Sequence, residues 1–343
     1  MKPVPRKPSL PGTILGTATE LVAGRTRPQT CYGTYAGDMP DARFRLRIAV
    51  VEHADSFQMH AHEYSEICLV LGGRATHLTD YGNHLLGTGD AFVINSDTRH
   101  GFTDTHKLRL CNVMFDPRQF LSGQRDLHRL MGYHALFDLQ PRSTHPEEFR
   151  ERLHLRPADL ARVEQLVAAM QDETSGHEEG WQTVVRSLFL QLATLLSRCY
   201  ASQQSHQATP LTRLANVVAH IQKHFREPLR IEDLARLAHL STSQFQRTFK
   251  RSFNTTVVKF ITRVRLHEAC ELLKNPNCDV THTALECGFN SPAFFSTQFK
   301  KLKGEAPSAY RRRHLEMISG SEAPHRLEAE PTKSTHRLRV AHQ

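Results

Sequence analysis

The sequence lacks the features that mark membrane and secreted proteins. No run of 18 apolar residues occurs, and the N-terminus M-K-P-V-P-R-K-P has no apolar segment of the kind that a signal peptide requires. The seven cysteines are odd in number and include no C-x-x-C pair, so a disulfide framework is not indicated. We therefore expect a soluble cytoplasmic protein with reduced thiols and no membrane partner.

Acidic residues are in short supply in one part of the chain only. Residues 209–316 hold 18 Lys and Arg against 9 Asp and Glu, whereas the remainder holds 26 of each and is neutral. The net charge of +9 therefore belongs to the C-terminal part. The length of 343 residues predicts two domains. A basic domain of this kind is typical of nucleic-acid binding, because positive charge supplies the sequence-independent part of DNA affinity.

Residues His239–Lys250 read H-L-S-T-S-Q-F-Q-R-T-F-K and predict a short capped helix. Ser241 can cap it, and Gln244 three residues later completes a capping box. Phe245 and Phe249 are four residues apart, so they share one face of the helix and can be buried together. An amphipathic segment just before this stretch predicts a second short helix after a tight turn. The pair is typical of a helix-turn-helix, whose exposed polar row enters the DNA major groove.

The same pattern recurs about fifty residues later in Asn290–Lys300. Ser291 is the expected cap, and Pro292 takes the first helical position, where a missing N–H costs nothing. Phe295 and Phe299 repeat the buried pair. A long apolar pattern between the two copies predicts a connecting helix. The alternative is a plain helical bundle with solvated polar faces, which does not account for the repeated capped turn.

Residues 211–313 resemble the C-terminal domain of AraC-type bacterial transcription regulators. The resemblance rests on the segments R-L-H-E-A-C-E-L-L-K (265–274), C-G-F-N-S-P-A-F-F-S-T-Q-F-K-K (287–301) and A-P-S-A-Y-R (306–311). Two positions depart from the family pattern, since Asn254 replaces a glycine and Thr283 replaces a core isoleucine. Asn tolerates the left-handed conformation that such a glycine adopts, so the turn is expected to survive. The resemblance implies a tandem helix-turn-helix DNA-binding domain.

Exposed residues of the two predicted recognition helices are the candidates for DNA contact. In the first helix they are Ser243, Gln246, Arg247 and Lys250. Arginine can bind guanine through two hydrogen bonds and glutamine can bind adenine in the same way, so we expect Gln246 and Arg247 to read bases. In the second helix they are Asn290, Ser291, Ala293, Ser296, Thr297 and Lys300. Their mostly short, neutral side chains suit phosphate contacts or apolar contact with thymine methyl groups.

The N-terminal part has the pattern of a small β-barrel. From Phe44 to Phe115, short β-type runs alternate with turn residues, which predicts a barrel or jelly roll. Within it, the spacing His60-x-His62-x3-Glu66, followed by Gly89-Asp90 and then His100, resembles the two sequence motifs of cupins. Strand alternation places His60 and His62 on one face, pointing into the barrel.

Three roles are open for His60, His62, Glu66 and His100. In cupin enzymes these positions bind a metal, and imidazole with carboxylate suits Fe, Mn, Ni or Zn. Regulators with a cupin-type sensor use the same positions to hydrogen-bond a sugar or another small effector, and the residues could also be structural. We expect effector binding without a metal or other cofactor. Asn95, Asp97 and Arg99 either add contacts at the barrel mouth or are exposed loop residues.

Three further stretches, H-A-H-E-Y-S-E-I, G-D-A-F-V-I-N-S-D-T-R-H and L-R-L-C-N-V-M-F-D-P, are similar to regulators of L-rhamnose catabolism. This similarity implies a sugar effector, with a deoxyhexose as first choice. Two apolar stripes in residues 157–200 predict a pair of antiparallel helices. In the resembling family such helices dimerise the sensor; alternatively, both pack on their own barrel.

Together these patterns predict an α+β protein. Its expected parts are a loosely ordered lead-in (1–40), a cupin-like effector-binding domain (41–156), a helical dimerisation segment (157–200), a linker (201–210), an all-α DNA-binding domain with two helix-turn-helix units (211–315) and a disordered tail (316–343).

We expect a homodimeric transcription regulator that binds double-stranded DNA and a small effector and is not an enzyme. The family resemblance favours activation, with RNA polymerase as a further partner. The alternative from another class is a metal-dependent cupin enzyme, such as an isomerase or dioxygenase, fused to a DNA-binding module. A third is a constitutive DNA-binding protein whose barrel has lost its ligand.

Overall fold

The structure, a computed structural model, describes residues 31–39, 41–53, 56–142, 152–203 and 209–320. The chain forms two compact units, residues 1–261 and 262–343. The boundary falls inside helix α11 (Val257–Leu272), so the two predicted helix-turn-helix copies belong to different units. Most of the predicted lead-in, half of the linker and most of the tail lie outside the described residues. The predicted domain limits stay predictions.

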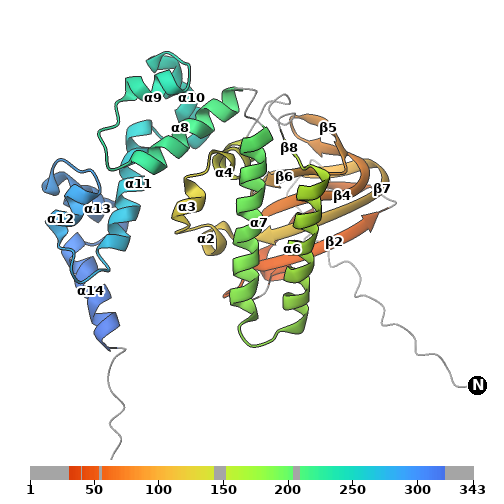
Figure 1. Ribbon diagram of the computed structural model, residues 1–343, viewed down its shortest axis with the longest axis horizontal. Helices are drawn as coiled ribbons and strands as arrows, with labels where there is room; N and C mark the ends of the chain where they lie inside the picture. Colours follow the sequence, from red (N-terminus) through yellow and green to blue (C-terminus); the bar gives the residue numbers. More distant parts are fainter. Residues whose placement is uncertain (1–30, 40, 54–55, 143–151, 204–208, 321–343) are drawn as a thin grey trace, which may run out of the picture. The chain divides into compact units, whose positions relative to one another are not determined.

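The first unit is built around a curved, eight-stranded sheet (Figure 1). Its strands are β1 (Cys31–Gly33), β2 (Leu46–His53), β3 (Phe57–His62), β4 (Ser65–Thr79), β5 (Gly82–Gly87), β6 (Asp90–Ile94), β7 (His100–Phe115) and β8 (Leu153–His154). The order is β1-β3-β7-β4-β6-β8, with β2 also paired to β7 and β5 to β4. All pairs are antiparallel except β1 with β3. The predicted α+β class, with an N-terminal sheet domain, is confirmed.

The two long strands β4 and β7 pair along most of their length and give the sheet its curvature. The register of this pair shifts at several points between Val70 and Thr76, and Gly73 among them has a φ of +77°. Such bulges bend a strand and increase its twist, which helps a sheet to close around a core. The enclosed core consists of Cys68, Val70, Ala75, Leu86, Phe92, Ile94, Phe102, Leu108 and Leu110.

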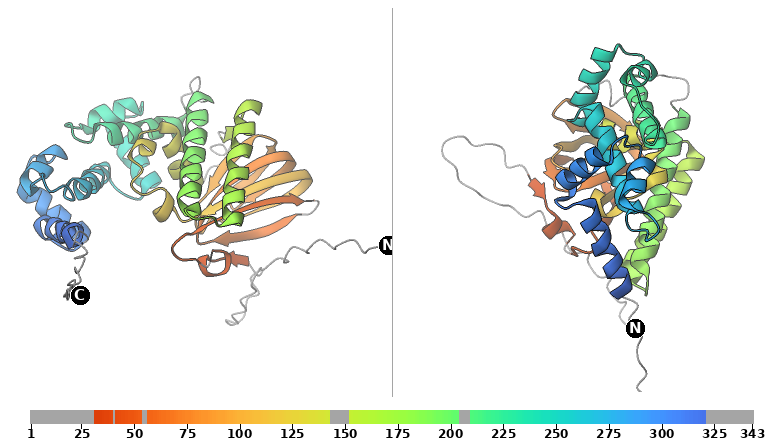
Figure 2. Two further views of the ribbon diagram at one scale, coloured as in Figure 1. Left: turned by 60° about the horizontal axis from the view of Figure 1, so that its bottom comes forward. Right: turned by 90° about the vertical axis from the view of Figure 1, so that its left-hand side faces the viewer.

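Helices α6 (Pro157–Gly176) and α7 (Trp181–Gln203) form a hairpin across one face of the sheet (Figures 1 and 2). The apolar stripe of α7 is buried there, with Phe189 against Phe115 and Phe120 at ring-centroid distances of 4.8 and 5.0 Å. The predicted pairing of the two helices is confirmed. Much of the stripe therefore covers the chain's own sheet, which is the alternative that the sequence left open, and dimerisation stays a prediction.

Short elements fill the connections. They are α1 (Tyr35–Asp38), α2 (Pro117–Phe120), α3 (Arg125–His128), α4 (Met131–Tyr133), the π-helix η1 (His134–Leu139) and the 3-10 helix η2 (Gln140–Arg142). Part of the predicted loose lead-in is ordered, because β1 pairs with β3 and Thr34 caps α1. A three-residue strand is too short to show alternation, so its sequence gives no β signal.

The helical region begins with α8 (Pro210–His224) and ends with α14 (Pro307–Gly320). The first helix-turn-helix is α9 (Ile231–Leu237) with α10 (Thr242–Phe253). The predicted capping box of Ser241 and Gln244 is present, and Phe245 and Phe249 are fully buried. Asn254 ends α10 in the left-handed conformation with a φ of 50°, as expected for a residue that replaces glycine.

The second helix-turn-helix is α12 (Val280–Glu286) with α13 (Pro292–Lys303). Ser291 caps α13 by accepting a hydrogen bond from the N–H of Phe294 at 3.2 Å, and Phe295 and Phe299 are buried. The hydroxyl of buried Thr283 donates to the carbonyl oxygen of Asp279 at 2.7 Å. Because this polar atom is satisfied, threonine is tolerated in place of the family's isoleucine.

Candidate functional site

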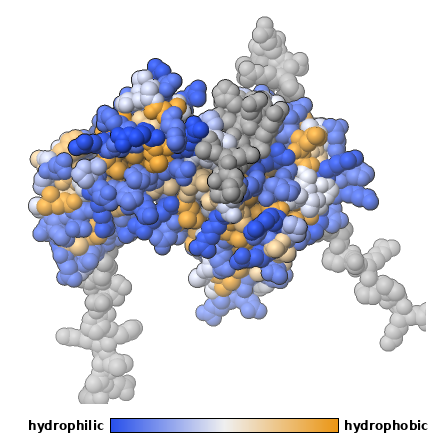
Figure 3. Space-filling model, turned by 45° about the horizontal axis from the view of Figure 1, so that its top comes forward, coloured by the Kyte–Doolittle hydropathy of each residue, from blue (hydrophilic) through white to orange (hydrophobic). Residues whose placement is uncertain are grey.

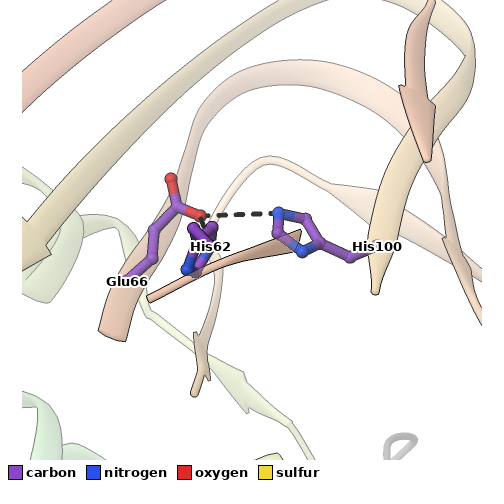
Figure 4. A group of neighbouring side chains, drawn as sticks. All are labelled: His62, Glu66 and His100. Atoms are coloured by element: carbon purple, nitrogen blue, oxygen red, sulfur yellow. Dashed lines mark hydrogen bonds and ion pairs between the residues drawn. The ribbon is translucent and has the colours of Figure 1, made fainter. Parts of the chain in front are cut away.

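Three buried polar side chains meet inside the curved sheet. His62 ends β3, Glu66 lies at the start of β4, and His100 begins β7; none of them is more than 3% exposed. The Nε2 atoms of His62 and His100 lie 3.1 and 3.5 Å from the same oxygen, Oε2 of Glu66 (Figure 4). We call these three residues the His-Glu-His group. Their convergence agrees with the cupin-like motif.

The backbone fixes both imidazole rings of the His-Glu-His group. Nδ1 of His62 lies 2.7 Å from the carbonyl oxygen of Tyr64, and Nδ1 of His100 lies 3.1 Å from that of Thr98. A carbonyl oxygen only accepts hydrogen bonds, so each Nδ1 carries the hydrogen and donates it. In the neutral ring this leaves the lone pair on Nε2, and both Nε2 atoms face Glu66.

The carboxyl group of Glu66 lies between these two rings. Burial raises its pKa, but the contacts with His100 and His62 outweigh burial and hold the pKa of Glu66 well below its usual 4.5. Two imidazole nitrogens and a carboxylate oxygen, with ligand atoms all within 4.8 Å of one another, make up the group. Divalent transition metals bind this donor set, so the residues fit a metal of the kind that cupin enzymes hold.

The fourth predicted residue, His60, does not join the group. It pairs directly with His100 across β3 and β7, and the two rings lie 4.2 Å apart. Its Nδ1 is 3.0 Å from the carbonyl oxygen of Gln58. Burial and the neighbouring His100 lower the pKa of His60 from 6.5 to about 4, so its ring is neutral at neutral pH. Cross-strand pairing thus places His60 beside His100 and outside the His-Glu-His group, and its role in effector binding stays a prediction.

A cavity of about 580 Å³ adjoins the His-Glu-His group, and His100 lines it. The sheet and the loop before β7 form one side, and α4, η1 and η2 contribute the other. Its polar lining includes Ser65, His77, Thr79, Asp80, His84, Asn95, Asp97, Arg99, His100, Asp138, Gln140 and Arg142. Tyr81, Tyr133 and Phe137 add aromatic surface. The volume lies in the range of small-molecule sites. Of the predicted effector residues, only His100 lines this cavity.

Two histidines of the cavity, His77 and His84, were not found from the sequence. They are direct cross-strand partners on β4 and β5, and the ring of His77 stacks on Phe102 at 5.3 Å. Burial, with the charge of nearby His100, lowers the pKa of His77 well below 6.5. Up to Val70 the inward positions of β4 are even-numbered, but the bulges shift them to odd numbers, as for His77. Simple alternation from Glu66 therefore misses His77.

The three rim residues named from the sequence do line the cavity. Asn95 accepts a hydrogen bond from the hydroxyl of Ser65 at 3.1 Å. Asp97 accepts one from the hydroxyl of Tyr32, and this bond raises the pKa of Tyr32 to about 12. Arg99 forms an ion pair with Asp80 at 3.3 Å. Both charged residues at the rim are thus held in place by partners.

The predicted contact residues of α10 all lie on its surface. Ser243, Gln246, Arg247 and Lys250 are exposed, while Phe245 and Phe249 hold the opposite side of the helix in the core. The N-terminal cap at Ser241 leaves the first turn of α10 well formed. These four side chains therefore form one polar face that can approach DNA.

On α13, Ala293, Thr297 and Lys300 are exposed and Ser296 is half-buried, and Asn290 and Ser291 are exposed just before it. The hydroxyl of Thr297 donates to the carbonyl oxygen of Ala293 at 3.0 Å, which leaves its methyl group for apolar contact. The sequence reading missed Phe294, which is 52% exposed on the same helix. The face shown in Figure 3 is mostly hydrophilic with scattered hydrophobic patches, so a lone exposed ring is not unusual.

Both halves of the chain match known families. Residues 46–193 match the family model of the AraC-like ligand binding domain, and residues 234–313 match that of a helix-turn-helix domain. The chain is an AraC-type regulator. The resemblance drawn from the sequence motifs is thereby confirmed, for the sensor as well as for the DNA-binding part.

Several proteins are similar to this AraC-type regulator. The HTH-type transcriptional activator RhaR of Mannheimia succiniciproducens is 23% identical to it over 76% of this chain and 88% of its own length. The HTH-type transcriptional activator RhaS of Escherichia fergusonii is 27% identical over 75% of this chain and 88% of its own length. A solved structure of a probable AraC family regulator from Rhodopseudomonas palustris CGA009 is 31% identical, covers 30% of this chain and 96% of its own, and has a TM-score of 0.29.

Because these relatives are transcriptional activators, the AraC-type chain groups with regulators of transcription, with one part for an effector and one for DNA. Among the helices of the described ranges, none is both long and apolar enough to cross a membrane.

Proposed function

We propose that this AraC-type protein activates transcription at specific DNA sites in response to a neutral sugar, with L-rhamnose as the first candidate. The observation that carries the proposal is the cavity of about 580 Å³ with polar groups on several elements around it. A sugar offers many hydroxyl groups, and each needs a partner once it leaves water. The similarity of the sensor motifs to regulators of L-rhamnose catabolism supports this sugar.

In this proposal His77 and His84 form hydrogen bonds with the effector, together with Asn95 at the rim, and the ring of His100 borders the site. Neutral imidazole rings suit hydroxyl groups, because one nitrogen donates and the other accepts. The aromatic rings of Tyr133 and Phe137 supply an apolar surface for the carbon face of the sugar. His62 and Glu66 lie behind His100 and hold its ring in position.

The DNA contacts in the proposal are those expected from the sequence. Gln246 and Arg247 read bases in the major groove, Ser243 lies beside them, and Lys250 binds phosphate. From the second helix-turn-helix, Asn290, Ser291, Ala293, Ser296, Thr297 and Lys300 contact phosphates or thymine methyl groups. The exposure of the α10 face and the basic charge of this domain support the assignment.

The remaining partners are also proposals. Two chains associate through a groove on the hairpin of α6 and α7, whose lining includes Leu166, Leu190 and Leu195. The DNA-bound dimer contacts RNA polymerase in the cytoplasm. The barrel senses and does not catalyse. An enzymatic barrel is the second candidate, since the His-Glu-His group has the donor set of metal-dependent cupin enzymes.

The test is direct measurement of sugar binding. L-rhamnose, added to the full chain, should raise the melting temperature, with D-glucose and other aldoses compared at equal concentration. In calorimetric titration, His84→Gln should weaken L-rhamnose binding about tenfold, because a lost hydrogen bond in a buried polar site costs ~1–3 kcal/mol. The exposed His106 lies outside the cavity lining, so His106→Gln is the matched control and should bind as the wild type does.

The regulatory part of the test uses DNA. Wild type should bind its DNA site more tightly when L-rhamnose is present, and His84→Gln should need more sugar for the same gain. If no aldose or polyol shifts the melting temperature or the DNA affinity, the sugar-sensing proposal is rejected. If a sugar is instead converted to a product, the enzyme candidate replaces it.

A further inference from the structure

We infer that His62, Glu66 and His100 bind one divalent transition-metal ion, and that the sensor of this regulator is therefore a metalloprotein. The inference concerns the His-Glu-His group alone. It does not depend on which effector enters the neighbouring cavity, and it is tested without effector or DNA.

The first support is the direction of the lone pairs. Nδ1 of His62 and of His100 each donate to a backbone carbonyl, at 2.7 and 3.1 Å. Both Nε2 atoms then direct lone pairs toward Oε2 of Glu66, which is itself an acceptor. Three acceptor atoms thus face one another in a buried place. Histidines that bind metals are commonly held in this way, with the second nitrogen donating to a carbonyl group.

The second support is that a single proton satisfies this arrangement poorly. A proton on Nε2 of His62 would give a hydrogen bond to Glu66 at 3.1 Å, but Nε2 of His100, at 3.5 Å, would still face the carboxylate with a lone pair. One metal ion, in contrast, can accept a lone pair from each of the three ligand atoms, which all lie within 4.8 Å of one another.

The donor set also indicates the class of metal. Two imidazoles and one carboxylate, with no thiolate, suit Mn²⁺, Fe²⁺, Co²⁺, Ni²⁺ and Zn²⁺ better than Mg²⁺ or Ca²⁺, which prefer oxygen donors only. Three protein ligands leave room in the coordination shell for water or another oxygen ligand. Because His100 belongs both to this group and to the cavity lining, the bound ion would lie next to the effector site.

The experiment uses the full chain after dialysis against a chelator. Titration with Zn²⁺, and separately with Mn²⁺, should show one tight site per chain and a higher melting temperature at one equivalent. The chain has 22 histidines, so weak surface binding of Zn²⁺ is expected as a background. Two controls separate the tight site from this background. One is the comparison between variants, and the other is Mn²⁺, which binds imidazole more weakly than Zn²⁺ does.

Glu66→Gln and His100→Gln should lower the metal affinity of the tight site by on the order of 100-fold or more, because each removes a direct ligand. Even the loss of a residue that only supports a ligand lowers metal affinity by about 10–100-fold. His60→Gln is the matched control. It alters a histidine whose ring lies 4.2 Å from that of His100 but which stands outside the group. The metal affinity of His60→Gln should stay within about threefold of that of wild type.

If the variants fail to fold, X-ray absorption of the wild-type protein with one equivalent of Zn²⁺ still decides. The expected spectrum has two imidazole ligands, with the remaining ligands oxygen, at about 2.0–2.2 Å. The inference is overturned if wild type binds no metal more tightly than its background, if Glu66→Gln retains the tight site, or if the spectrum shows a different ligand set. Loss of the site in His60→Gln to the same extent would also overturn the three-residue assignment.

Discussion

Arg247 is the side chain that we expect to contribute most directly to sequence-specific DNA binding. It is exposed on α10, one turn before Lys250 and two residues after buried Phe245. The guanidinium group carries a planar fork of donors that matches the edge of guanine, whereas a lysine ammonium is a point charge. Charge and base recognition at this position can therefore be separated by substitution.

Arg247→Ala should weaken binding to the specific DNA site by ~1–3 kcal/mol, through loss of the paired hydrogen bonds to guanine. Arg247→Lys should keep most of the affinity for random DNA, because the positive charge is retained, but should lose discrimination between sites. The dissociation constants for the specific site and for random DNA are measured at one salt concentration. Equal losses on specific and random DNA in Arg247→Ala would mean that this residue contacts phosphate only.

At the scale of elements, the sensor depends on close packing of short helices that the sequence hardly reveals. Helix α4 is a single turn, yet Gly132 in it lies directly against the backbone of α7. A Cβ atom at Gly132 would stand 1.8 Å from the carbonyl oxygen of Ser197, a distance that no contact allows. The same short turn leads into η1, which lines the cavity, so this contact fixes one wall of the cavity.

Gly132→Ala should therefore destabilise the sensor by at least ~1–3 kcal/mol, the usual cost of forcing an extra group into a packed interior. Gly87→Ala is the matched control, since a Cβ there meets nothing within 4 Å. Thermal unfolding of both variants and of wild type provides the comparison. An unchanged melting temperature for Gly132→Ala would show that α4 can move away from α7 at little cost.

At the scale of the whole molecule, the two sides of the α6 and α7 hairpin differ in their surroundings. One side is buried on the sheet. The other carries a groove of about 1010 Å³ whose lining includes the half-buried leucines Leu166, Leu190 and Leu195 among arginines and glutamines. Apolar side chains within a polar border are the usual composition of a protein interface. This groove supports the proposal that two chains associate here.

Leu195→Glu should convert a dimer into a monomer, because it places a charge in the apolar centre of the proposed interface. Val184→Glu is the matched control, because Val184 is 41% exposed on the same helix but is not part of the groove lining. Light scattering after size-exclusion chromatography gives the mass of each. A monomeric wild type, or a dimer that survives Leu195→Glu, would contradict the proposal.

The local features of the chain were determined by the sequence alone. The capping box of Ser241, the proline after Ser291 and the left-handed Asn254 act through neighbouring residues, so their identity and spacing suffice to predict them. The repeat of the phenylalanine pairs fixed the two helix-turn-helix units for the same reason. The motif of His60, His62, Glu66 and His100 likewise predicted a converging group from strand alternation, and the structure brings His62, Glu66 and His100 together.

Only the tertiary structure decided which residues share the site. His60 fits the motif but pairs across strands with His100 and stays outside the group. His77 enters the cavity because bulges in β4 reverse the alternation of inward and outward side chains. The sequence does not show where a bulge inserts an extra residue into a strand. The stripe of α7 predicted a helix with an apolar face, but burial against the sheet depends on residues far away in the chain. Strand pairing and packing between distant parts of the chain set these outcomes, and they cannot be predicted from a short segment of sequence.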